Sequence, residues 1–144
     1  MRTGLTHLLA MAALCATAGT TAAQDAEVFN ELAGEWRYTH SPSGCVETMT
    51  FNEDGTFEGG GAEEVYGGTY VLAAGESDSG RQQLDLEITH DNGLADCQNN
   101  SWNDAGMSRT LYVAFRAGDS LVFYEYDDGG EPLARFTRVL AEAE

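Results

Sequence analysis

Two short stretches decide the fold: GEW at residues 34–36, near the start of the folded part, and FTRV at residues 136–139, near its end. Between them lie about eight short runs that alternate apolar and polar residues, as β-strands do. None of the intervening segments reads as a crossover helix, so consecutive strands are expected to be antiparallel. We therefore predict an all-β fold, a single antiparallel up-and-down β-barrel whose last strand returns beside its first.

The clearest strand is LDLEIT at residues 84–89, in which apolar and polar residues alternate strictly. The turn NEDG at 52–55 ends in glycine, as hairpins often do, and the glycine pair at 67–68 indicates a bulge. Apolar residues at helical offsets predict a short N-terminal helix over 25–32. The predicted strands are residues 36–40, 45–51, 56–59, 66–72, 84–89, 111–115, 121–126 and 133–140.

The first 23 residues have the pattern of a secretory signal peptide. Arg2 gives a basic start, residues 5–16 are mostly apolar, and small residues lead to an expected cleavage site after Ala23. The apolar run is too short to span a membrane. We expect a signal peptide at 1–23, one barrel domain at 24–144, and a periplasmic or secreted protein. A lipid-modified Cys15 is disfavoured by the bulky Leu14 before it.

The expected mature chain is strongly acidic. It carries six arginines, no lysine and 24 acidic residues, a formal charge of −18. We therefore expect neither nucleic acid nor an anionic membrane surface as a partner, because the negatively charged protein would repel their phosphates. Two explanations of the acidity stay open: solubility, and attraction to cations or to a basic partner.

Two cysteines, Cys45 and Cys97, remain after the expected cleavage. An even number of cysteines in an oxidising compartment predicts one disulfide. A role as metal ligands is the weaker hypothesis, because neither cysteine has another one nearby in the sequence.

The opening LAGEW at 32–36 resembles the Gly-x-Trp opening of lipocalins and their calycin relatives. The hairpin FNEDGTF at 51–57 is similar to one in bacterial lipocalin-like proteins. The chain thus resembles a small secreted barrel protein of the bacterial lipocalin-like type in the calycin superfamily. This resemblance implies that Arg138 packs over Trp36 as a structural pair, through a cation–π contact that closes the barrel.

Our leading hypothesis is a binding protein for a small, partly apolar ligand. An eight-stranded barrel can be filled by its own side chains or can hold one small ligand. Glycines at 59–61 and 67–68 favour a cavity if they face inward, and a solid barrel if they mark bulges. Leu86, Ile88 and Val113 are further interior candidates. The expected ligand-binding residues are Tyr38, Met49, Phe57, Tyr70, Phe115, Phe123 and Tyr126.

The alternative function is a protein-binding module with a solid barrel. Small periplasmic inhibitors of serralysin-type metalloproteases also begin with Gly-x-Trp and combine an eight-stranded barrel with one disulfide. By that resemblance, residues 24–30 would enter the protease cleft. The 52 positions between Cys45 and Cys97 depart from the closer spacing in those inhibitors.

We expect no cofactor, no metal site and no enzymatic activity. No serine lies in a Gly-x-Ser-x-Gly elbow, and neither mature histidine has an evident nucleophile beside it. His40 and His90 each end a predicted strand, where they are either exposed or able to bind a transition metal with Cys97 or a carboxylate. The acidic turns at 52–55 and 127–131 could bind calcium, but hairpin geometry accounts for both.

Overall fold

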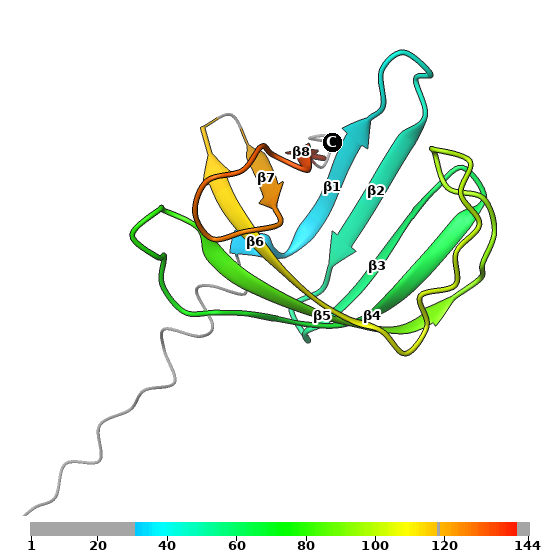
Figure 1. The fold of residues 1–144 in the computed structure, drawn as a ribbon. Coiled ribbons are helices and arrows are strands. Elements are labelled where there is room, and N and C mark those ends of the chain that lie inside the picture. The colour runs from blue at the N-terminus through cyan, green and yellow to red at the C-terminus, as the bar shows by residue number, and fades with distance from the viewer. Residues whose placement is uncertain (1–30, 118, 141–144) are drawn as a thin grey trace, which may run out of the picture.

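The computed structural model describes residues 31–117 and 119–140. It forms a closed antiparallel barrel in which each strand pairs with the next and the last pairs with the first (Figure 1). The predicted all-β, eight-stranded up-and-down topology is confirmed, and it is compatible with a lipocalin-like fold. The strands are β1 (Gly34–Thr39), β2 (Val46–Phe51), β3 (Thr56–Gly61), β4 (Glu64–Leu72), β5 (Gln82–Asp91), β6 (Ser108–Arg116), β7 (Ser120–Tyr124) and β8 (Ala134–Arg138).

Two predictions fall wholly or mostly outside the described residues. The signal peptide at 1–23 lies entirely outside them, and of the helix expected over 25–32 only Glu31 and Leu32 are described. No complete helix occurs in the described part of the chain. None that could cross a membrane is found there either.

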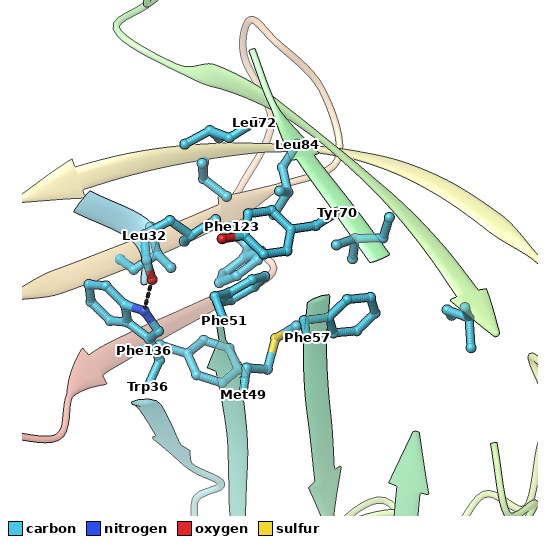
Figure 2. Close-up of a cluster of buried hydrophobic side chains, with 14 residues drawn as sticks. Leu32, Trp36, Met49, Phe51, Phe57, Tyr70, Leu72, Leu84, Phe123 and Phe136 are labelled. Carbon is cyan, nitrogen blue, oxygen red and sulfur yellow. Dashed lines mark hydrogen bonds between the residues drawn. The ribbon is translucent and has the colours of Figure 1, made fainter. Parts of the chain in front are cut away.

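One end of the barrel is closed by Trp36 and packed solid. The Trp36 side chain is buried, and its indole Nε1 donates a 2.8 Å hydrogen bond to the Leu32 carbonyl (Figure 2). The Arg138 guanidinium lies 4.1 Å from the centre of the indole ring. It also donates hydrogen bonds to the carbonyls of Ala33 (2.7 Å) and Glu31 (2.5 Å). One arginine thereby joins the last strand to the segment that enters the first.

Aromatic rings fill the interior beside this floor. The Phe51 ring lies 6.0 Å from that of Phe57 and 5.0 Å from that of Tyr70 (Figure 2). The Tyr70 hydroxyl donates a 2.7 Å hydrogen bond to the Asn52 carbonyl, which satisfies a polar group brought into an apolar interior. Phe115 packs against Trp36 with ring centres 6.3 Å apart. This half of the barrel therefore has the filled interior that the sequence left as one of two options.

The glycines of β3 and β4 make room for neighbouring side chains. A Cβ on Gly59 would lie 2.5 Å from the Tyr66 ring, and one on Gly61 would lie 2.8 Å from Cys97 Sγ. The register shifts between Gly67 and Gly68, so this pair marks the predicted bulge. The space beside the inward-facing Gly59 and Gly61 is thus filled by the Tyr66 ring and the Cys97 sulfur. These two glycines therefore do not create a cavity.

A disulfide between Cys45 and Cys97 ties the β1–β2 hairpin to the β5–β6 loop. The loop also meets the β3–β4 turn, where the amides of Glu63 and Glu64 both donate to the Ala95 carbonyl. The predicted pairing is confirmed, and such a bond is typical of oxidising, extracytoplasmic compartments. A cross-link over 52 positions stabilises a fold by about 4 kcal/mol in the chain-entropy estimate.

The contact between Arg138 and Trp36 predicts a measurable loss of stability when the charge is removed. Arg138→Met keeps much of the apolar stem but loses the cation–π contact and two charge-assisted hydrogen bonds, so we expect the free energy of unfolding to fall by about 2 kcal/mol. Urea denaturation measures this. Arg116→Met, at an exposed end of β6, is the matched control and should change stability by less than about 0.5 kcal/mol. Equal effects of the two variants would contradict the role given to Arg138.

Candidate ligand site in the barrel mouth

A cavity of about 260 Å³ opens where β4 begins, β5 ends and β8 begins. Its lining is divided by chemistry. The apolar part, most of which is buried, is formed by side chains from five strands and one loop, among them three of the core residues labelled in Figure 2. The apolar lining residues are Met49, Leu86, Ile88, Leu111, Phe123, Leu133, Ala134 and Phe136, and the polar ones are Glu64, Tyr66, Asp91, Asp104 and Arg109.

The alternation of β5 and the bulge opposite it place the lining residues. Leu86 and Ile88 face inward, as their alternation with acidic and hydroxyl residues predicts. Gly68 pairs with Ile88, whereas Gly67 pairs with His90 and Tyr66 with Asp91. The bulge therefore inserts an extra residue, and Asp91 lines the cavity while His90 lies outside over Gly67.

The mouth carries a strong negative potential. Partial burial raises the pKa of the Glu64 carboxyl to about 7, and the nearby carboxylates of Asp91, Asp96, Glu47 and Asp104 add to the shift. The pKa of the Tyr66 hydroxyl is raised as well, mainly by burial and then by Glu47 and Glu64.

Arg109 is the single cationic side chain in the lining of this cavity. It forms an ion pair with Asp104, so part of its charge is already neutralised. The remaining carboxylates leave the mouth acidic, and the most favourable addition to it is a positive charge.

The structure gathers only part of the expected ligand-binding set at this cavity. Met49 and Phe123 line it, as do Leu86 and Ile88. The remaining interior members pack in the core but are not among the lining residues: Tyr38, Phe57, Tyr70, Phe115 and Val113.

Tyr126 does not face the barrel interior, contrary to the prediction from the sequence. Its side chain is 59% exposed, because β7 ends at Tyr124 and residue 126 already belongs to the loop before β8. The predicted strand over 121–126 was too long by two residues. Tyr126 therefore lies in an exposed loop and is not among the residues that line the cavity.

The polar half of the site was not recognised in the sequence. Tyr66 lies in phase with Tyr70 and Leu72, so alternation along β4 could have identified it. Asp104 lies in the β5–β6 loop and Arg109 near the start of β6. No periodic pattern marks Asp104, and the inward turn of Asp91 depends on a bulge whose effect on register only the folded strands reveal.

A second group of side chains lies at the same end of the barrel. His40 Nε2 is 3.2 Å from Glu47 Oε1, and both side chains are partly buried. Together with Cys97 Sγ, these donor atoms lie within 4.8 Å of one another. No other group of three such donors was found among residues 31–117 and 119–140. His90 is exposed and takes no part.

The acidic turns have structural roles. Asp54 accepts hydrogen bonds from the amide and hydroxyl of Thr56, which lower the pKa of the Asp54 carboxyl. Asp127 accepts hydrogen bonds from Ser77 (2.5 Å) and Ser79 (3.1 Å), joining the β7–β8 loop to the β4–β5 loop. Hairpin and loop geometry thus accounts for both carboxylates.

Comparisons with known protein families, with curated proteins and with solved structures found no match. The functional argument therefore rests on the geometry and charge of the barrel mouth.

The raised pKa of Glu64 predicts a dependence of stability on pH. Because the folded pKa of about 7 lies above the ordinary value of 4.5, ionised Glu64 destabilises the fold fully above about pH 7 and not at all below about pH 4.5. Glu64→Gln should therefore stabilise the protein at pH 8 by about 1 kcal/mol, less than the full shift implies because solvent screens this partly exposed group. Urea titrations at pH 8 and pH 4.5 measure this, with exposed Glu58→Gln as control. A gain at pH 4.5 equal to that at pH 8 would contradict the assignment.

Proposed function

We propose that this chain is an exported, lipocalin-like binding protein that holds a small, partly apolar ligand in the barrel mouth and performs no chemistry on it. The observation that carries the proposal is a cavity with an apolar floor and a charged rim in an otherwise filled barrel. Concave apolar sites with a few converging polar groups and a perturbed carboxyl pKa are where proteins usually bind small molecules.

The size of the cavity limits the ligand. About 260 Å³ lies just below the roughly 300–1,000 Å³ of pockets for drug-sized molecules. A compact body with few rotatable bonds therefore fits best, and burying it against Leu86, Ile88 and Phe136 contributes about 25 cal/mol per Å² of apolar surface. Longer molecules would have to extend through the mouth.

The charge of the rim favours a cationic end on the ligand. Glu64, Asp91 and Asp104 line the opening, and the single lining arginine is paired. A protonated amine placed there would lower the pKa of Glu64, since a nearby positive charge favours the carboxylate. A ligand carboxylate would add one more negative charge to the same field and should bind much more weakly.

A protein-binding module is the second candidate function. The β5–β6 loop exposes three large apolar side chains, Leu94, Trp102 and Met107, with exposed fractions of 49%, 67% and 47%. Large apolar groups on one loop are a common feature of protein interfaces. Residues 24–30, the segment expected to enter a protease cleft, lie outside the described residues.

Three ligands of one shape test the proposed function. Adamantylamine, adamantanol and adamantanecarboxylate share a compact apolar body and differ in the charge of the head group. We expect the amine to bind at least about tenfold more tightly than the alcohol, equivalent to 1.4 kcal/mol, and the carboxylate to bind most weakly. Isothermal titration calorimetry and native mass spectrometry measure the affinities.

A matched pair of variants locates the binding. Ala134→Leu adds volume inside the cavity and should weaken amine binding by at least about tenfold, since overfilling such a site costs roughly 1–3 kcal/mol. Ala73→Leu makes the same change at an exposed position after β4 and should leave binding unchanged. Failure of all three compounds to bind, or equal binding by both variants, would reject the cavity as the site. Loss of a protein partner in Trp102→Ala would then favour the second candidate.

A further inference from the structure

The side chains of His40, Glu47 and Cys97 form a mixed nitrogen, oxygen and sulfur donor set. The pairwise separations of their donor atoms do not exceed 4.8 Å. The partner of Cys97 is Cys45, so a second sulfur lies directly beside this set. Histidine, cysteine and carboxylate are the ligands that zinc prefers in proteins. The cavity described above does not include these residues among its lining.

His40 is held in place with a ring nitrogen left unsatisfied. Its amide donates to the Cys45 carbonyl and its carbonyl accepts from Gly44, each at 2.8 Å. Its ring and that of Tyr38 pack edge to face, with ring centres 4.6 Å apart. Nε2 is buried and has no hydrogen-bond partner, although Glu47 Oε1 lies 3.2 Å away, because the geometry is not that of a hydrogen bond. A buried polar atom without a partner is costly, and a bound ion would satisfy it.

Gly61 makes the convergence possible. An ideal Cβ at this position would lie 2.8 Å from Cys97 Sγ and 2.8 Å from Glu47 Cγ. Any other residue at position 61 would push the sulfur or the carboxylate away. The donors therefore come together because β3 has no side chain at this position. The β1–β2 hairpin supplies His40 and Cys45, β2 supplies Glu47, and the β5–β6 loop supplies Cys97. Elements far apart in the sequence thus contribute to one cluster.

We propose that His40, Glu47, Cys97 and Cys45 form a zinc site that is closed while the disulfide is intact and opens when a dithiol reduces it. In the oxidised protein the two sulfurs are bonded to each other and carry no negative charge, so neither is a good ligand. Reduction converts both into potential thiolates beside a histidine and a carboxylate that are already in place.

Opening of the site requires a two-electron reduction of the disulfide between Cys45 and Cys97. A dithiol reductant supplies two electrons and two protons; the bond between the Sγ atoms of Cys45 and Cys97 breaks, each sulfur gains a proton, and the reductant's own sulfurs join in a disulfide. Zinc then replaces the two thiol protons, which pass to the solvent. The metal remains divalent throughout.

The separation of the nitrogen and oxygen donors fits tetrahedral zinc. Bonds of about 2.0–2.1 Å to nitrogen and oxygen place these two ligand atoms about 3.3 Å apart, and His40 Nε2 and Glu47 Oε1 are 3.2 Å apart. The two sulfurs, bonded to each other in the disulfide, must separate to roughly 3.8 Å on a tetrahedral zinc ion.

Zinc titration of the oxidised and reduced proteins tests this. The chain is reduced with dithiothreitol, freed of reductant without oxygen, and titrated with zinc chloride against a chromophoric chelator. We expect about one zinc ion per reduced chain, bound at least about 100-fold more tightly than by the oxidised chain. Cobalt in place of zinc should give the intense sulfur-to-metal absorption band of thiolate ligation in the reduced protein alone.

Two histidine variants separate this site from general metal binding. His40→Gln should weaken zinc binding by at least about 100-fold, since it removes the only nitrogen ligand, whereas His90→Gln, exposed on the outside of the barrel, should bind zinc as the wild type does. Gly61→Ala should weaken binding through the displaced sulfur and carboxylate.

Equal affinity in the two redox states, or no effect of His40→Gln, would overturn the proposal. If the reduced chain loses its far-ultraviolet circular dichroism, zinc should restore it, because binding then contributes folding free energy. A reduced chain that stays unfolded in zinc would also overturn it. Adamantylamine binding to the oxidised protein is read out separately, so failure of the zinc site leaves the cavity proposal standing.

Discussion

The guanidinium of Arg138 over the indole of Trp36 is the contact on which barrel closure depends. Strands β1 and β8 share only two paired positions, Trp36 with Arg138 and Arg37 with Thr137, so the backbone ladder at this seam is short. Arg138 strengthens it by a cation–π contact and by hydrogen bonds to two carbonyls before β1. With the seam held, none of the eight described strands has a free edge to pair with another chain. The packing of the other strands depends on this closure of the barrel.

Closure divides the interior into two unequal parts. Near Trp36 the barrel is filled by aromatic rings, and the polar groups there are satisfied, as by the hydrogen bond from Tyr70 to Asn52. At the other end β3 contributes mostly glycine, and the side chains of Tyr66 and Cys97 fill the space that larger β3 side chains would otherwise take. What remains between Ile88, Phe123 and Phe136 is the cavity. The site thus results from incomplete filling of a core that is otherwise closely packed.

The two proposed sites share one electrostatic environment. Glu47 belongs to the donor set around His40 and also contributes to the raised pKa of Glu64 at the cavity rim. A cation bound by either site would reduce the repulsion felt by carboxylates in the other. The acidity of the chain, ambiguous as a bulk property, is concentrated here into a mouth suited to positive charge.

Local patterns in the sequence determined the strand order, the barrel and the inward positions of Leu84, Leu86 and Ile88, because side chains alternate with a period of two along any strand. The redox argument for Cys45 and Cys97 was likewise sufficient, since the two cysteines outside the expected signal peptide allow one pairing. The sequence left open whether the barrel is hollow, because filling depends on how rings from distant strands share one volume. Only the tertiary structure turned Asp91 inward through a bulge, ended β7 before Tyr126, and brought His40, Glu47 and Cys97 together over Gly61. Those outcomes depend on register and on contacts between segments some fifty residues apart, and neither leaves a periodic trace in the chain.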